Sequence, residues 1–188
     1  WTQNGNNLDI TDAEWVSDPD IESGLQFDSN DEIAILDNTK QVVNLRKGLI
    51  FIKFKSFSSV TDNAFRCLFG DRNPVSGSFT LTKWNNNILY FQFYDNVTYH
   101  YIGIANSHLT DWQTGLYMAI AWDINNTIFA GHKMAILLNG EYITPVIAAN
   151  ASSWNDVSVR TNLGVGNDDI NTTSFSNGII SDLRIYNK

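Results

Sequence analysis

The chain has 188 residues, of which 43% are hydrophobic and 17% are charged, and this balance excludes an intrinsically disordered protein. One β-sandwich or barrel of this length routinely forms a single domain. The formal net charge of -8 at pH 7, without any basic run, excludes nucleic acid as an expected partner. No apolar run approaches the ~20 residues that a membrane-spanning helix needs, so we expect no membrane insertion.

Residues 1–23 differ from the rest of the chain because they are rich in Asp, Asn and Thr. Trp15 and Ile21 are their main apolar side chains, which predicts a lead-in strand or an arm. Regular alternation starts at Gly24, and no repeat or linker divides the sequence after it. We therefore expect an N-terminal strand or arm over residues 1–23 and one domain over residues 24–188.

The segment Leu49–Lys55 shows the clearest period of two. Lys53 and Lys55 share one face of the expected strand and Ile50 and Phe54 share the other, so one face is predicted to be core and the opposite face partly wet. The other segments with strand character are, in chain order, Leu25–Phe27, Glu32–Leu36, Phe65–Phe69, Phe79–Trp84, Ile88–Tyr94, Thr98–Ile104, Tyr117–Trp122, Lys133–Leu138, Tyr142–Thr144 and Ile179–Tyr186.

Clusters of turn residues separate these segments and predict antiparallel hairpins. Asn139-Gly140 is a strong two-residue hairpin signal, and Asn85–Asn87 forms a further turn cluster. Apolar residues nowhere recur at helical spacing over three turns, although Asn106–Gln113 suits one short helical turn. The sequence therefore predicts an all-β fold.

Four motifs follow one another at plausible spacing. They are a strand to Phe-Asp before an acidic turn, an alternating aromatic strand, a strand pair that ends in Asn-Gly, and a closing strand that ends in Arg-Ile-Tyr-Asn. They lie at Gly24–Ile33, Gly48–Phe57, Tyr117–Glu141 and Phe175–Asn187. In this order they resemble the laminin-G-like jelly-roll family of bacterial and viral proteins.

The resemblance implies a two-sheet antiparallel jelly-roll β-sandwich of the concanavalin A-like lectin and glucanase superfamily. It also implies an extracellular, cell-surface or virion location. Gly115–Tyr117 replaces the family's aromatic-His-His segment, and Ser181-Asp182 replaces its usual acidic pair, so polar-site detail transfers less well than fold. Independently of the family, alternation places Asp182, Arg184 and Tyr186 on one face of the closing strand.

Glucanase chemistry has no visible motif in this chain. A retaining glucanase needs two carboxyl groups about 5–5.5 Å apart, set by alternate positions of one strand. The chain has only four Glu residues, and none begins a Glu-x-Asp-x-x-Glu strand. Asp18 and Asp20 have same-face spacing, but Pro19 between them favours a solvated turn. We therefore expect a protein that is not an enzyme.

Acidic residues could form a structural Ca²⁺ site. Asp28 and Asp31 lie on the first turn of the family motif and Asp182 lies on the last strand, and hard cations bind clustered carboxylate oxygens. The resemblance implies such a site because many relatives bind Ca²⁺ there. The alternative, which has equal weight, is that these acids are only turn and strand-face residues; Asp168 and Asp169 form a second, weaker acidic loop.

Aromatic residues beside polar loop residues are candidates for sugar binding, because ring faces stack on the CH surfaces of sugars while Asn, Asp and Arg bind the hydroxyls. Taken individually, each of them fits core or rim packing better than sugar binding, and Trp122 is expected in the core. The candidates are Trp84, Tyr99, Tyr101, Trp112 and Trp154.

Two functions fit these observations. The first is a non-catalytic carbohydrate-binding module of a larger secreted or surface protein, with a glycan as partner. The second is a structural or adhesion domain of a viral or bacterial surface appendage, which would act through protein contacts and associate into a homo-oligomer or a larger assembly. Both rest on fold-level analogy.

Overall fold

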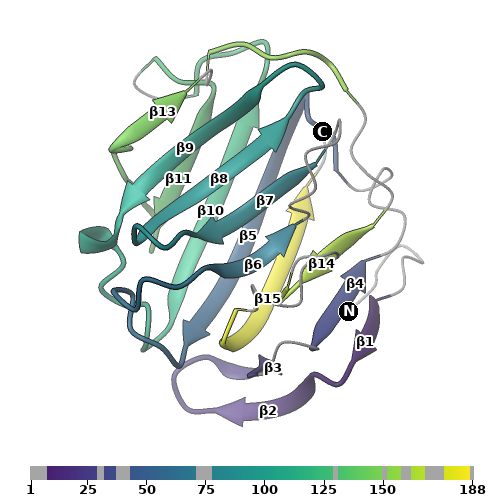
Figure 1. Cartoon of the computed structure of the whole chain (residues 1–188), viewed down its shortest axis with the longest axis vertical. Coiled ribbons are helices and arrows are strands. Elements are labelled where there is room, and N and C mark those ends of the chain that lie inside the picture. The colour runs from purple at the N-terminus through teal and green to yellow at the C-terminus, as the bar shows by residue number, and fades with distance from the viewer. Residues whose placement is uncertain are drawn as a thin grey trace.

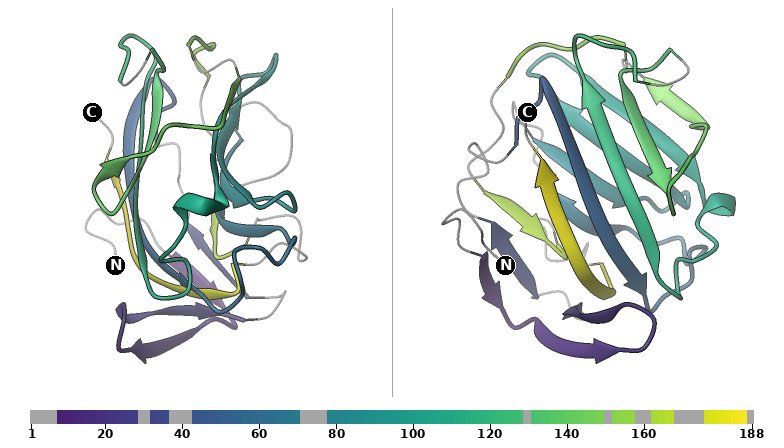
Figure 2. Two further views of the ribbon diagram at one scale, coloured as in Figure 1. Left: turned by 90° about the vertical axis from the view of Figure 1, so that its left-hand side faces the viewer. Right: turned by 180° about the vertical axis from the view of Figure 1, so that it is seen from behind.

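The computed structural model describes residues 8–28, 32–36, 43–70, 78–128, 131–149, 152–157, 162–167 and 176–186. These residues form fifteen β-strands and one short 3-10 helix, Asn106–His108. Neighbouring strands pair antiparallel, and two sheets stack face to face (Figure 1, Figure 2). The predicted two-sheet antiparallel β-sandwich is confirmed. Within the described part of the chain, no helix has the length and apolar character needed to cross a membrane.

The front sheet, whose central strands face the viewer in Figure 1, has eight strands in the order β1-β4-β14-β6-β7-β8-β9-β13. Its centre is a meander in which β6 to β9 follow one another in the chain and pair in turn. The strands are β1 (Leu8–Thr11), β4 (Ile33–Leu36), β6 (Arg66–Gly70), β7 (Phe79–Lys83), β8 (Ile88–Tyr94), β9 (Tyr99–Ala105), β13 (Ile147–Ala149) and β14 (Leu163–Val165).

The back sheet has seven strands in the order β12-β11-β10-β5-β15-β3-β2. Its central strands lie in front in the right-hand view of Figure 2, where β5 runs between β10 and the yellow β15. This order brings three segments that are far apart in the sequence side by side. The strands are β2 (Glu14–Asp18), β3 (Glu22–Phe27), β5 (Lys47–Ser56), β10 (Leu116–Asp123), β11 (Met134–Leu138), β12 (Glu141–Tyr142) and β15 (Gly178–Tyr186).

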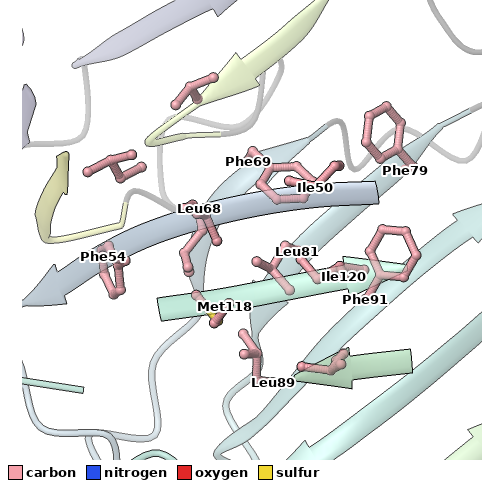
Figure 3. Packing of buried hydrophobic residues seen from close by; sticks show 14 of the residues in the cluster. Ile50, Phe54, Leu68, Phe69, Phe79, Leu81, Leu89, Phe91, Met118 and Ile120 are labelled. Carbon is pink, nitrogen blue, oxygen red and sulfur yellow. The ribbon is translucent and has the colours of Figure 1, made fainter. Parts of the chain in front are cut away.

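The inner faces of the two sheets form one hydrophobic core, shown in Figure 3. Ile50 and Phe54 of β5 and Ile120 of β10 lie opposite Leu81 and Phe91 of the front sheet, and all five are fully buried. Burying such a side chain stabilises the fold by about 1.5–3 kcal/mol. Because side chains alternate along a strand, Phe51 and Lys53 of β5 lie on the outer face.

Trp122 lies in the core, as predicted from the sequence. It pairs with Gly48 across β10 and β5, and a Cβ atom at Gly48 would collide with the indole ring. The indole Nε1 donates a hydrogen bond to the carbonyl oxygen of Asn44 at 2.8 Å. Glycine at position 48 therefore makes room for the largest side chain in this part of the core.

The N-terminal segment adds a strand to each sheet. β1 pairs with β4 in the front sheet and β2 pairs with β3 in the back sheet. β3 runs across the boundary expected between residues 23 and 24. Lys55 Nζ fastens the β2–β3 hairpin to β5, at 2.7 Å from Asp18 Oδ2 and 2.6 Å from Asp20 Oδ2. These hydrogen bonds raise the pKa of Lys55.

Candidate functional site

Three strands at the centre of the back sheet, β10, β5 and β15, define an outer face with a regular grid of side chains. Residues that are directly opposite one another form three cross-strand rows. They are Tyr117–Lys53–Asp182, Ala119–Phe51–Arg184 and Ala121–Leu49–Tyr186.

Three aromatic rings of this grid are open to solvent. Phe51 is 41% exposed, Tyr117 is 53% exposed and Tyr186 is 45% exposed. Phe51 and Tyr186 meet edge to face, with ring centroids 5.9 Å apart. The neighbouring outward residues of β10, Ala119 and Ala121, are small and do not cover the rings. We call Phe51, Tyr117 and Tyr186 the aromatic platform.

Charged groups lie beside the aromatic platform on β15. Arg184 Nε donates to Asp182 Oδ1 at 3.0 Å, and Arg184 Nη2 lies 2.8 Å from Asp182 Oδ2. The hydrogen bond and charge of Asp182 raise the pKa of Arg184, with a smaller contribution from the Tyr186 hydroxyl. The same-face pair expected from the alternation is therefore present, and it offers both donors and an acceptor next to the rings.

Lys53 of β5 lies between this pair and Tyr117. Its ammonium nitrogen is 4.9 Å from the centroid of the Tyr117 ring, in a cation–π arrangement. The residue as a whole is only 8% exposed. Stacking rings, a guanidinium, a carboxylate and an ammonium thus converge on one open sheet face, which is an arrangement for holding a polar ligand by its apolar surface and its hydroxyl or acidic groups.

The outer face of the front sheet is also aromatic, but its rings cover one another. Ring centroids are 5.3 Å apart for Trp84 and Tyr90, 5.8 Å apart for Tyr90 and Tyr101, and 5.0 Å apart for Tyr94 and Tyr99. Tyr90 is only 8% exposed, and the other four rings are half-buried. This aromatic layer therefore presents ring edges rather than open faces.

The five aromatic residues selected from the sequence do not converge. Trp84, Tyr99 and Tyr101 lie on the outer face of the front sheet, in the aromatic layer. Trp112 and Trp154 lie in the core, where Trp112 packs against a phenylalanine of β5 at 4.9 Å and Trp154 Nε1 donates to a backbone carbonyl at 2.8 Å. A tryptophan with polar neighbours in the sequence can therefore lie either on the surface or in the core.

Of the three acids proposed for Ca²⁺, the structure describes Asp28 and Asp182, and these two lie apart. Asp28 is exposed and accepts a hydrogen bond from Gln26 Nε2 at 2.7 Å, while Asp182 is engaged by Arg184. Since Phe27 pairs with Gly178 and β15 has a bulge before Asp182, Asp28 and Asp182 lie about 13 Å apart along the strands. Asp31, Asp168 and Asp169 lie outside the described residues, among which no cluster of three potential metal-ligating side chains occurs.

The turn between β8 and β9 is built around Asp95, whose side chain is buried. Its Oδ1 accepts from the backbone N–H of Thr98 at 2.9 Å, and its Oδ2 accepts from that of Asn155 at 2.9 Å and lies 2.9 Å from His100 Nε2. Burial raises the pKa of Asp95, but these hydrogen bonds outweigh it and lower the pKa to about 2. Asp95 therefore fastens the aromatic layer's hairpin to the segment that follows β13.

The aromatic platform was missed at the sequence level, although a signal for it exists. Alternation places Phe51 on the same outer face as Lys53, and places Tyr186 with Arg184. The sequence alone does not show that β5 pairs with both β10 and β15. This pairing places Tyr117 on the same sheet face as the other two rings. Reading outward positions of the central strands would have found two of the three residues.

The fold is similar to those of botulinum neurotoxin binding domains. The receptor binding domain of the C/D mosaic serotype is 16% identical, with a TM-score of 0.68, over 97% of this chain and 43% of that chain. The binding domain of the DC toxin in complex with SialylT is 13% identical, with a TM-score of 0.65, over 98% of this chain and 44% of that chain. The same domain in complex with rat synaptotagmin II is 15% identical, with a TM-score of 0.63, over 97% and 44%.

At these identities the likeness concerns the fold alone. The chain spans less than half the length of the toxin domains that it matches. No family model matches the sequence, and no curated protein matches it either.

Proposed function

We propose that this chain is a non-catalytic carbohydrate-binding module of a larger secreted or surface protein, and that it binds sugar through the aromatic platform. The observation that carries the proposal is the set of three open rings, Phe51, Tyr117 and Tyr186, beside the Asp182–Arg184 pair. Rings on one side and fixed donors and acceptors on the other are the two elements that sugar recognition needs.

The rigid sheet explains how this site would work. Each ring projects from a strand that is hydrogen-bonded on both sides or, for Tyr186, from β15 paired with β5. A ligand would therefore meet rings that are already positioned, so little ordering free energy is lost on binding. Pyranose CH groups would stack on the rings, and hydroxyls would bind the Arg184 guanidinium and the Asp182 carboxylate.

The structural neighbours support the binding role. They are toxin binding domains, and one of them is in complex with SialylT. Their greater length agrees with the proposal that this chain belongs to a larger polypeptide. An extracellular location follows from the same proposal, because a glycan-binding module acts where glycans are displayed.

A protein-binding role is the second candidate. Leu49 and Leu137 also belong to the outer face of the back sheet, and they add apolar surface beside Phe51. One neighbouring toxin domain is in complex with a protein, rat synaptotagmin II. If this role is the correct one, the isolated chain associates with itself or with a surface protein through that face, and light scattering would detect self-association.

A glycan array tests the first proposal. The wild-type chain is compared with the triple variant Phe51→Ala, Tyr117→Ala, Tyr186→Ala and with Trp15→Ala, which removes an exposed ring from the edge of the same sheet. We expect binding by the wild type and by Trp15→Ala, and none by the triple variant. No binding by the wild type, or full binding by a folded triple variant, contradicts the proposal.

A further inference from the structure

We infer that the aromatic platform contains a subsite for the carboxylate of an acidic sugar, with Lys53 as the residue that binds it. The inference rests on the proposed carbohydrate-binding function and specifies its ligand as a sugar that carries a carboxyl group. It is carried by the surroundings of Lys53 on the outer face of the back sheet.

Lys53 is a largely covered residue whose ammonium group has no acceptor among the described residues. Its ammonium group has three hydrogen-bond donors. Among the described residues, Lys53 has no side-chain hydrogen bond and no ion pair, and its ammonium contacts the Tyr117 ring. Lys53 Nζ does not belong to the buried side-chain nitrogen and oxygen atoms without a partner, so the ammonium reaches solvent at the end of a covered side chain. A ligand carboxylate at this point would supply an acceptor.

Lys55, by contrast, is a structural lysine whose ammonium group is bound by carboxylates of this chain. It lies two residues further along the same strand and on the same face, and Asp18 and Asp20 both bind its Nζ, at 2.7 Å and 2.6 Å. The chain has 20 acidic residues against 12 lysines and arginines, so acids are in excess. The missing acceptor at Lys53 is therefore a local feature of this sheet face, and it does not reflect a shortage of carboxylates in the chain.

The neighbouring acid does not neutralise Lys53. Asp182 is opposite Lys53 in the strand register, but Arg184 holds both of its carboxylate oxygens. The two cations Lys53 and Arg184 and the single carboxylate of Asp182 leave one positive charge at this place, in a chain of formal charge -8. One net charge suits one ligand carboxylate, whereas the overall charge repels polyanions such as nucleic acid.

The position of Lys53 also suits a sugar. Tyr117 is its cross-strand neighbour and Phe51 lies two residues away on the same face, so a carboxylate on Lys53 would leave the attached ring beside the aromatic platform. The carboxylate would accept N–H donors from Lys53, and the ring would stack on Tyr117 or Phe51. No bond is formed or broken, so this subsite confers selectivity without catalysis.

The test uses probes that differ only in the carboxyl group. Binding of methyl galacturonoside, which carries one carboxyl group, is compared by calorimetry with binding of its methyl ester, and binding of sialyllactose with that of sialyllactose methyl ester, so that uronic and sialic acids are distinguished. The proteins are the wild type, Lys53→Met, Lys53→Arg and Lys47→Met. Lys47 lies on the same face of β5, at the far end of the strand, and its loss removes the same charge.

We expect the wild type to bind at least one acidic probe about tenfold or more tightly than its neutral counterpart. Lys53→Met should lose this preference, Lys53→Arg should keep most of it and Lys47→Met should keep all of it. Equal binding of acidic and neutral probes, a preference that survives in folded Lys53→Met, or no binding to any of the four probes overturns the inference. If the wild type binds an acidic probe and its neutral counterpart equally, and the platform triple variant binds neither probe, the inference fails while the proposed function stands.

Discussion

Both outer faces of this sandwich carry aromatic rings, but the rings differ in how far they are covered. On the front sheet, Tyr90 lies between Trp84, which packs against it at a tilt, and Tyr101, which meets it edge to face, and Tyr90 is almost covered. On the back sheet, Tyr117 and Tyr186 are about half exposed. Aromatic content alone therefore does not mark a binding face; what matters is whether neighbouring side chains leave the ring faces free.

The largest expected effect separates the two faces by binding. The triple variant Phe51→Ala, Tyr117→Ala, Tyr186→Ala should lose roughly 100- to 1000-fold in glycan affinity, at about 1–1.5 kcal/mol for each ring. The double variant Tyr99→Ala, Tyr101→Ala on the front sheet should bind as the wild type does. Calorimetric titration measures the glycan affinity of both variants. If the double variant lost binding and the triple variant kept it, the binding site would lie on the front sheet.

The second prediction separates the faces by stability. Tyr90→Ala should lower the free energy of unfolding by about 3 kcal/mol, because it empties a covered position between two rings. Tyr117→Ala should lower it by less than about 1 kcal/mol, because its ring is largely in water already. Urea unfolding of the two variants gives the numbers, and equal losses would contradict the distinction between a packed layer and an open platform.

Acid gives a third, smaller effect that is confined to the front sheet. The pKa of Asp95 is about 2 in the folded chain against an ordinary value of 3.8, so its contribution to stability is present above pH 4 and disappears as the pH falls from about 4 to 2. At neutral pH, Asp95→Asn should cost about 2 kcal/mol. Unfolding curves from pH 6 to pH 2 should show the gap between wild type and variant closing; a constant gap would contradict this role.

Calcium provides the smallest expected effect. If Ca²⁺ raises the melting temperature, Asp28→Asn should abolish the increase and Asp182→Asn should not, because the strand register keeps Asp182 about 13 Å from Asp28. The measurement is thermal unfolding with Ca²⁺ and with EDTA. Loss of the Ca²⁺ response in Asp182→Asn alone would show that Asp182 is a ligand and would contradict the assignment of this residue to the platform.

Local alternation predicted most of the fold. Ile88–Tyr94 is a strand with the predicted bounds, and the Asn139-Gly140 turn joins β11 to β12 with positive φ at both residues. The expected helical turn is present as the 3-10 helix Asn106–His108. The N-terminal segment, expected as one lead-in strand or an arm, forms two strands, β1 and β2. The strands that were missed are the three-residue β13 and β14, which are too short to show a period.

The candidate site was harder to predict because it depends on pairing between distant segments. Trp112 and Trp154 have polar neighbours in sequence, yet their rings are buried by residues of other strands. Tyr117 and Tyr186 are 69 residues apart in the sequence and share one sheet face only because both of their strands pair with β5. A period of two identifies the outward positions but not which strands adjoin, so the platform could be read only from the sheet order.

The most direct test of the central claim is a chemical-shift map of the isotopically labelled chain, titrated with the strongest ligand from the glycan array. The largest changes should fall on Phe51, Tyr117 and Tyr186 and on adjacent backbone amides of β5, β10 and β15. Changes centred on Trp84, Tyr99 and Tyr101, with the back sheet unaffected, would contradict the account and place the binding face on the front sheet.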